Sequence, residues 1–233
     1  ESFKLVYAEP WLSTGASKGG QTVLELEQLY PDDIDAVVAA VAPIIPDLYD
    51  SGFDAFIDDL AQSECGQEVR ALQTAMLERR EELMVLAQEE AQQEGATFER
   101  VGLELAMDIA IVEWEFIFWQ YTSACGDLPN PQGSATALYD ALGSSSPLTY
   151  SDGRLGPFMP FFYQCRAQLG YPGMTDAHLS TSLFPAISES YLESLTPADA
   201  TLPSYDNSAM TSLAQWVQSD AEGVVMIYGA FDP

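Results

Sequence analysis

The sequence predicts an α/β protein in which a parallel sheet is interrupted by a large helical insertion. Two apolar, valine-rich runs, Asp35–Pro43 and Gly223–Tyr228, are typical of buried parallel strands. Near the N-terminus, the short apolar segment Pro10–Thr14 is expected to form a strand, and Gln21–Tyr30 a helix that Pro31 ends. Roughly 180 residues separate the two valine-rich runs, whereas a parallel crossover requires only about a dozen residues.

The excess length between these runs indicates an inserted structure with its own core. We therefore expect three parts: a sheet core at residues 1–44, a helical cap at 45–221 that includes the return to the core, and a core strand at 222–233. With 233 residues, of which 47% are hydrophobic, the chain is long enough to bury such a core.

The inserted region has the apolar periodicity of helices rather than of strands. Asp47–Gln62 is amphipathic, and Gln67–Gln93 is expected to be one long helix that ends at Gly95. Phe98–Tyr121 is apolar on almost all sides, which predicts a helix in the middle of the helical layer. Shorter helices are expected at Ala135–Leu142 and Ser208–Gln218.

Charge and hydropathy exclude several classes of partner. The chain has 36 acidic and 8 basic residues and a net charge of −28, so it lacks the clustered cations that nucleic acid or anionic lipid requires. No run of about 18 apolar residues is present, so no membrane insertion is expected. An acidic, lysine-poor surface suits a protein in a salty or extracellular setting, although it is also an ordinary well-solvated surface.

The segment from Gly15 to Gly19 has the pattern G-x-S-x-G, with a further glycine at Gly20. A serine at the centre of this pattern is exposed on a strained turn between a strand and a helix. Close backbone approach predicts that glycine is required two residues before and two residues after Ser17. The helix that follows places its N-terminal dipole and the Lys18 N–H beside the serine, where they would stabilise an oxyanion.

Several segments together resemble a known family. The sequence TGASKGG followed by YPDDIDAVVAAVAP is similar to the secreted serine tripeptidyl and prolyl tripeptidyl/tetrapeptidyl aminopeptidases, a branch of the α/β-hydrolases. The similarity covers nearly the whole chain, and its most specific parts are SKGG and the final YGAFDP. The other matching segments are Cys65, Arg79-Arg80, Phe118–Tyr121 and Phe161–Pro172.

The resemblance implies part of an α/β-hydrolase parallel sheet with a large inserted helical cap. It also implies that Ser17 is the nucleophile, that the Lys18 N–H supplies half of the oxyanion hole, and that Asp232 after the last strand is the triad acid. In this fold the triad histidine follows the acid along the chain.

No histidine follows Asp232, and the single histidine, His178, precedes it in the loop-like sequence TDAHLS. We therefore expect His178 to be a surface residue outside the triad. The strands that should precede the serine turn are also missing. The sequence is accordingly interpreted as a fragment that lacks the N-terminal strands and the C-terminal histidine segment, and that is inactive by itself.

Two carboxylates interrupt the apolar run IAIVEWEFIFW, namely Glu113 and Glu115. A buried carboxylate is costly unless it is paired or faces a polar cavity. One interpretation is an ion pair with Arg79 or Arg80. The other is substrate binding, in which one of the two receives the charged amino terminus of a peptide. Glu113 matches the family pattern, whereas Glu115 stands where the family is expected to have proline.

Three cysteines do not form a complete framework. Cys65 and Cys125 each lie at the edge of an expected helix, and we favour a disulfide between them in an oxidising compartment. Cys165 lies in an apolar aromatic segment, where a buried free thiol is expected. The cysteine spacings do not suit zinc, so neither a metal site nor a cofactor is expected.

The function that these features favour is that of a secreted serine exopeptidase, which removes short peptides from free amino termini through an acyl-enzyme. Its expected partners are a peptide substrate and the remainder of the same polypeptide, with no nucleic acid. Two alternatives remain open at this stage: an esterase or lipase with the same serine turn, and a catalytically silent binding protein of the same fold.

Overall fold

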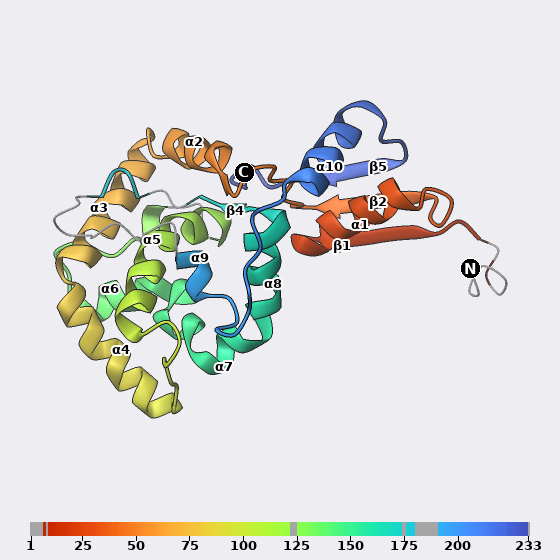
Figure 1. Cartoon of the computed structure of the whole chain (residues 1–233). Helices are drawn as coiled ribbons and strands as arrows, with labels where there is room; N and C mark the ends of the chain where they lie inside the picture. Colours follow the sequence, from red (N-terminus) through yellow and green to blue (C-terminus); the bar gives the residue numbers. More distant parts are fainter. Residues whose placement is uncertain (1–6, 8, 122–124, 174–175, 180–190, 233) are drawn as a thin grey trace.

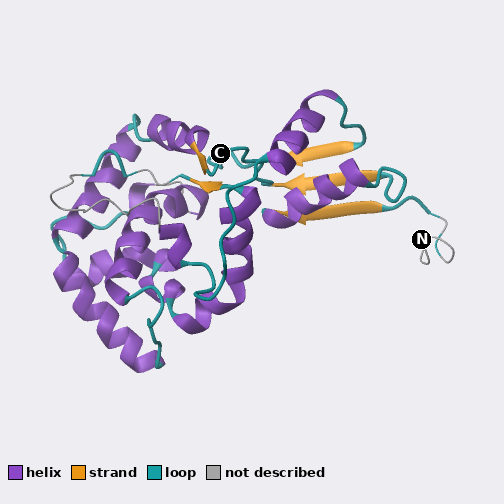
Figure 2. Ribbon diagram, viewed as in Figure 1, coloured by secondary structure: helices purple, strands orange, loops and turns teal. Residues whose placement is uncertain are grey.

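The computed structural model describes residue 7 and the ranges 9–121, 125–173, 176–179 and 191–232. The structure is rich in helix and has a small parallel sheet at one end, as an α/β protein requires (Figure 2). The sheet and the helical body lie side by side, and the C-terminal ends of the strands point toward the helical body (Figure 1).

The sheet contains three parallel strands in the order β1-β2-β5. They are β1 (Leu12–Ala16), β2 (Ala36–Ala40) and β5 (Val224–Ile227), each within two residues of its predicted start. In register, Ala16 pairs with Ala40, and Ala40 pairs with Ile227, so the three strands end side by side. The chain segments that follow these strands therefore share one edge of the sheet.

The two faces of the sheet have different surroundings. On one face, Val37 and Ala39 are buried against Leu24 of α1 (Lys18–Leu29) and Leu213 of α10 (Ser208–Ser219). On the other face, three apolar side chains stay largely exposed: Leu12 at 62%, Val225 at 53% and Ile227 at 51%. On this second face the β2 residues Ala36, Val38 and Ala40 are only partly buried, so β2 is not buried on both faces as its valine-rich sequence predicted.

The helical body is formed mainly between β2 and α10. It also contains a two-residue parallel pairing between β3 (Tyr49–Asp50) and β4 (Tyr171–Pro172) that the sequence did not predict. Its α-helices are α2 (Ser51–Leu60), α3 (Glu64–Glu78), α4 (Arg80–Glu94), α5 (Leu103–Tyr121), α6 (Ala135–Leu142), α7 (Asp152–Leu155), α8 (Met159–Gln164) and α9 (Tyr191–Ser194). Short 3-10 turns span Cys125–Asp127, Gly143–Ser145, Pro147–Tyr150 and Gly156–Phe158, and a π-helical turn spans Cys165–Leu169.

The single long helix expected at Gln67–Gln93 is instead two helices, α3 and α4. The break is at Arg79, whose φ of −109° and ψ of 18° lie outside the helical range. The Arg79 side chain donates to the Gly133 carbonyl and to Glu82, so tertiary contacts hold the break in place. The end of α4 is as expected, because Gly95 adopts a left-handed φ of 65°.

The apolar helix α5 lies at the centre of the helical body, as its sequence predicted. Residues on one side of it, including Met107 and Ile111, belong to a core cluster with α3, α4 and α6. Residues on another side, Ile109 and Ala110, belong to a second cluster with Tyr150 and the segments around it. At its C-terminal end, the Trp119 ring stacks on Phe231, which follows β5, at a centroid distance of 5.6 Å. Helix α5 thus connects both helical cores to the edge of the sheet.

The predicted disulfide and the predicted buried free thiol are confirmed. Cys65 and Cys125 form a disulfide with a Cα–Cα distance of 5.5 Å, and Cys165 is a buried free thiol. The disulfide joins the first turn of α3 to the segment after α5. Among the described residues, no helix is both long and apolar enough to span a bilayer.

The disulfide should stabilise the helical body, because it closes a loop with a sequence separation of 60 and so restricts the unfolded chain. We expect the Cys65→Ser/Cys125→Ser variant to lose about 2 to 4 kcal/mol of unfolding free energy in urea titrations. The parent protein should lose a similar amount in a thiol reductant, whereas the double variant should not respond to the reductant. A parent protein with equal stability in both conditions would contradict the prediction.

Candidate active site

Ser17 lies between a strand and a helix with strained backbone torsions. Strand β1 ends at Ala16, helix α1 begins at Lys18, and Ser17 has a φ of 52° and a ψ of −128°. A non-glycine residue in this region costs about 1 to 3 kcal/mol, and such strain is concentrated at functional sites. The Ser17 N–H donates to the Ala40 carbonyl at 2.9 Å, which fixes the turn to the end of β2. The Ser17 side chain is exposed.

The glycines around Ser17 have different roles from those expected. A Cβ on Gly15 would lie 2.2 Å from the Gly19 carbonyl oxygen, so the requirement for glycine before the serine holds. A Cβ on Gly19 would meet no described heavy atom within 4 Å, so the expected clash after the serine is wrong. The close approach is made by Gly20, where a Cβ would lie 2.9 Å from the Ala42 Cβ. Gly20 allows α1 to pack on the end of β2.

The turn also places unpaired donors beside the serine. Lys18 is the first residue of α1, and the first four N–H groups of a helix have no partner within that helix. These N–H groups and the helix dipole favour negative charge at this position. The backbone N–H of Lys18 is therefore one of the donors at the start of α1, directly after Ser17.

Asp232 follows β5 on the edge of the sheet that also carries Ser17. Its backbone N–H contacts the Gly229 carbonyl in a turn, and its Oδ1 accepts a hydrogen bond of 3.0 Å from Gln120 Nε2 of α5. Asp232 and Gln120 line a cavity of about 330 Å³, together with Val41, Trp119, Tyr121 and Gly229–Phe231. The carboxylate is thus held by the helical body and faces an open space.

Val41 is a strained residue in this region that the sequence analysis did not find. Its φ of 45° is a genuine outlier for a β-branched residue. Val41 follows β2, whose last residue accepts the Ser17 N–H, and its own N–H donates to the Ile227 carbonyl at 2.7 Å. It therefore lies between the ends of β1 and β5, and it lines the Asp232 cavity. Neither glycine nor asparagine marks this position in the sequence, so no local signal could have identified the strain.

Of the two carboxylates that the sequence analysis singled out in α5, Glu113 is the one that borders a cavity. The cavity has a volume of about 140 Å³ and is mostly apolar; besides Glu113, it is lined by Phe53, Val112, Phe116, Ile117 and Tyr171–Gly173. The Tyr150 hydroxyl donates to Glu113 Oε2. Burial raises the pKa of Glu113 to about 7, although the Tyr150 hydrogen bond opposes that rise.

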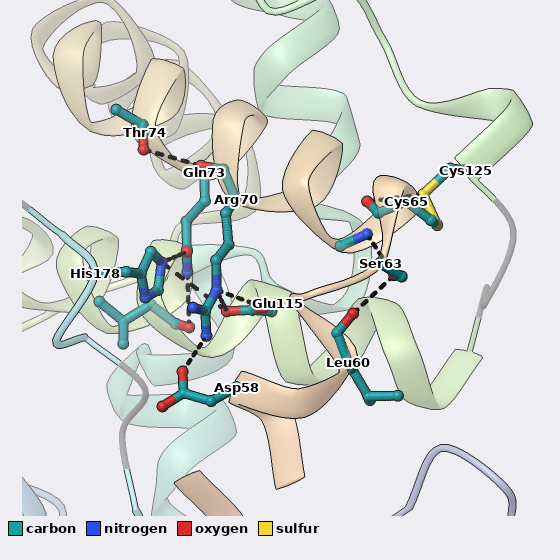
Figure 3. A network of polar contacts seen from close by, with 12 residues as sticks. Asp58, Leu60, Ser63, Cys65, Arg70, Gln73, Thr74, Glu115, Cys125 and His178 are labelled. Carbon is teal, nitrogen blue, oxygen red and sulfur yellow. Dashed lines mark hydrogen bonds and ion pairs between the residues drawn. A yellow bond between two sulfur atoms is a disulfide. The ribbon is translucent and has the colours of Figure 1, made fainter. Parts of the chain in front are cut away.

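Glu115 has a different environment, in which its side chain is completely buried against Arg70. Arg70 Nε contacts both Glu115 oxygens, at 3.0 and 3.3 Å, and its Nη2 contacts Asp58 at 2.6 Å. Figure 3 shows the guanidinium between the two carboxylates. The ion-pair interpretation thus applies to Glu115, but with Arg70 as its partner, because Arg79 and Arg80 pair with Glu82 and Asp108. A buried, paired Glu115 does not support its predicted role in substrate binding.

His178 lies beside this ion pair and is not the surface residue that the sequence suggested. Its Nε2 is 2.6 Å from Gln73 Oε1 and 4.0 Å from Glu115 Oε2 (Figure 3). Burial, and to a smaller extent Arg70, lowers the pKa of His178 to about 4. Gln73 in turn donates to the carbonyls of Ile111 and Val112 on α5. His178 is thus a neutral, hydrogen-bonded part of the helical body.

The serine turn, the carboxylate that follows β5 and the Glu113 cavity are the features that bear on function, and comparison with known proteins identifies the family. The family model described as PS-10 peptidase S37 matches residues 1–233, so the chain belongs to the peptidase S37 family. The comparison with solved structures found no match.

A curated relative is the prolyl tri/tetrapeptidyl aminopeptidase of Streptomyces mobaraensis. It is 32% identical to this chain over 239 residues. The aligned region includes all of this chain but 50% of the relative, so the chain spans about half of that protein's length.

Gly15 and Gly19 differ in the space available for a Cβ, so alanine substitutions at these two positions test the geometry of the serine turn. We expect Gly15→Ala to destabilise the protein by about 1 to 3 kcal/mol or more, because its Cβ would overlap the Gly19 carbonyl. Gly19→Ala should be neutral or stabilising by up to about 1 kcal/mol, because alanine is favoured over glycine in a helix. Urea unfolding of the two variants measures both effects, and a Gly19→Ala variant as unstable as Gly15→Ala would contradict this geometry.

Proposed function

We propose that the chain contributes the nucleophile, the acid and the amino-terminus site of a serine exopeptidase. The observation that carries the proposal is the strained, exposed Ser17, which lies on the same sheet edge as Asp232 in a member of a peptidase family. The relative described as a prolyl tri/tetrapeptidyl aminopeptidase supports short peptides with free amino termini as the substrate class.

In the proposed reaction, Ser17 Oγ attacks the scissile carbonyl while a histidine outside these 233 residues removes its proton. The tetrahedral intermediate places negative charge on the carbonyl oxygen, which accepts a hydrogen bond from the Lys18 N–H. The histidine then gives its proton to the leaving amine, and an acyl-enzyme remains on Ser17. Water hydrolyses this ester by the same route, and Asp232 holds the histidine in the required tautomer throughout.

The spacing along α5 supports an enzyme that acts at a fixed distance from the amino terminus. Glu113 and Gln120 are seven residues apart, so they share one face of the helix and are separated by about 10 Å along its axis. Phe116 and Ile117 lie between them on this face and line the Glu113 cavity. Gln120 binds Asp232, and an extended tripeptide spans about 10 Å. We propose that Glu113 binds the substrate ammonium.

The proposed fold is that of an α/β-hydrolase core, in which residues 45–221 form a cap and its return to the core. Parallel strands that end beside one another, and a helical body beyond those ends, support this assignment (Figure 1). Helix α10 packs on the sheet together with α1, so the return to the core begins before the last strand. We also propose an extracytoplasmic location, which the Cys65–Cys125 disulfide supports.

The proposal can be tested by enzyme kinetics. The enzyme must be a polypeptide that contains this chain and also supplies the histidine. Ser17→Ala should abolish release of p-nitroaniline from a tripeptide p-nitroanilide, and Asp232→Asn should reduce kcat about 10⁴-fold, because the histidine loses its acceptor. The N-acetylated substrate should be a poor one for the parent enzyme, because it has no charged amine.

The matched control is Glu222→Gln, which removes an exposed carboxylate just before β5 and should leave kcat unchanged. Activity of Ser17→Ala near that of the parent would exclude the proposed nucleophile. Equal kcat/KM for the free and acetylated substrates would exclude an exopeptidase and favour a general esterase or endopeptidase.

A further inference from the structure

Glu113 is surrounded by tyrosines, and only one of them is hydrogen-bonded to it among the described residues. Tyr150, 6% exposed, donates its hydroxyl to Glu113 Oε2. Tyr171 lines the same cavity as Glu113, and its ring packs edge-on against Tyr191 at a centroid distance of 6.2 Å. Tyr191 is 4% exposed, and its hydroxyl has no hydrogen-bond partner among the described residues.

The position of Tyr150 is fixed by its own segment. It ends the 3-10 turn Pro147–Tyr150, in which Ser146 Oγ accepts the Leu148 N–H and Leu148 is fully buried. The next residues are anchored through Asp152, whose carboxylate accepts from Thr97 Oγ1 and from two backbone N–H groups. The hydrogen-bonded segment around Tyr150 therefore holds its hydroxyl against α5.

We propose that Tyr150 is the positioning residue of the amino-terminus site, which orients Glu113 and keeps it available as an anion for the substrate ammonium. This inference rests on the proposed function of Glu113. The Tyr150 hydroxyl occupies Oε2, so Oε1 is the oxygen left for a ligand. Because a hydroxyl donor stabilises the carboxylate and not the carboxylic acid, the same bond also favours the charged form.

The surroundings of Glu113 make this bond important. The titratable groups around it are Tyr150 on the 3-10 turn, Tyr171 on β4, Tyr191 on α9 and, next to these tyrosines, Tyr49 and Cys165. Burial raises the pKa values of Tyr150, Tyr171, Tyr191 and Cys165, so these four side chains are neutral near pH 7. Burial raises the pKa of Glu113 to about 7, and the Tyr150 hydrogen bond is what opposes that rise.

The sign of the expected effect follows from this balance. Loss of the Tyr150 hydroxyl removes a contact that favours the carboxylate, so the pKa of Glu113 should rise further above 7. A peptide amine has a pKa near 8 and is charged below it. The parent site therefore binds best between about pH 7 and 8, where both partners are ionised. In a Tyr150→Phe variant, a larger fraction of Glu113 side chains is protonated in that window, so binding of the ammonium is weaker.

The test is a carboxyl NMR titration of Glu113 in the 233-residue protein, with Glu113→Gln used to assign the signal. Tyr150→Phe should raise the titration midpoint by about one pH unit, the size expected when one hydrogen bond to a charged group is lost. Tyr191→Phe is the matched control, because it removes a hydroxyl from the same cluster without removing a bond to Glu113. Tyr139→Phe removes a tyrosine–glutamate bond elsewhere, to Glu90. Neither control should move the midpoint.

Binding of trialanine amide, measured by calorimetry at pH 7, adds the ligand to the test. Tyr150→Phe should weaken binding about five- to tenfold, whereas N-acetyl trialanine amide should bind weakly to every variant. An unchanged Glu113 midpoint in Tyr150→Phe would overturn the inference, even if the enzyme hydrolyses peptides through Ser17. If the Glu113 midpoint shifts in Tyr150→Phe but the parent protein binds trialanine amide and its N-acetyl form equally, Tyr150 and Glu113 are coupled. Glu113 is then excluded as the ammonium site.

Discussion

Helix α5 has apolar side chains on almost every side, so it is stable in water only when other elements surround it. The rest of the helical body satisfies this requirement. Helices α3, α4 and α6 cover one side, and the segments around Tyr150 cover another. The C-terminal end of α5 stacks Trp119 on Phe231 and binds Asp232 through Gln120. Burial of one helix thus assembles the helical body and attaches it to the edge of the sheet that carries Ser17.

The same helix carries two carboxylates two residues apart, and their opposite environments show how a buried charge acquires a role. Glu115 is enclosed with Arg70, so its charge is matched within the protein. Glu113 accepts a hydrogen bond from a hydroxyl group and borders a cavity, but it forms no ion pair with any described residue. A cationic ligand would supply what the fold does not supply to Glu113. The chemical difference between these neighbours therefore arises from the elements that face each side of α5.

Local patterns predicted much of this structure. The serine turn, the three strands and the central apolar helix follow from side-chain chemistry over a few residues, and the disulfide was predicted from two cysteines that each lie at the edge of an expected helix. Features that depend on distant contacts were not predicted: Arg70 as the partner of Glu115 across 45 residues, the break at Arg79, and the strain at Val41. The role of Gly20 was missed because it depends on a contact with Ala42, which lies just after the neighbouring strand β2. Sequence spacing describes one element at a time, whereas these features are set between elements.

We propose Ser17 as the nucleophile on the sheet edge that also carries Asp232. The most direct test is mass spectrometry of a histidine-supplying polypeptide after treatment with a tripeptidyl phosphonate ester that has a free amine. We expect one covalent adduct on the peptide that contains Ser17 and none in Ser17→Ala. Slower labelling is expected in Asp232→Asn. An adduct on any other residue, or hydrolysis without modification of Ser17, would contradict the proposal.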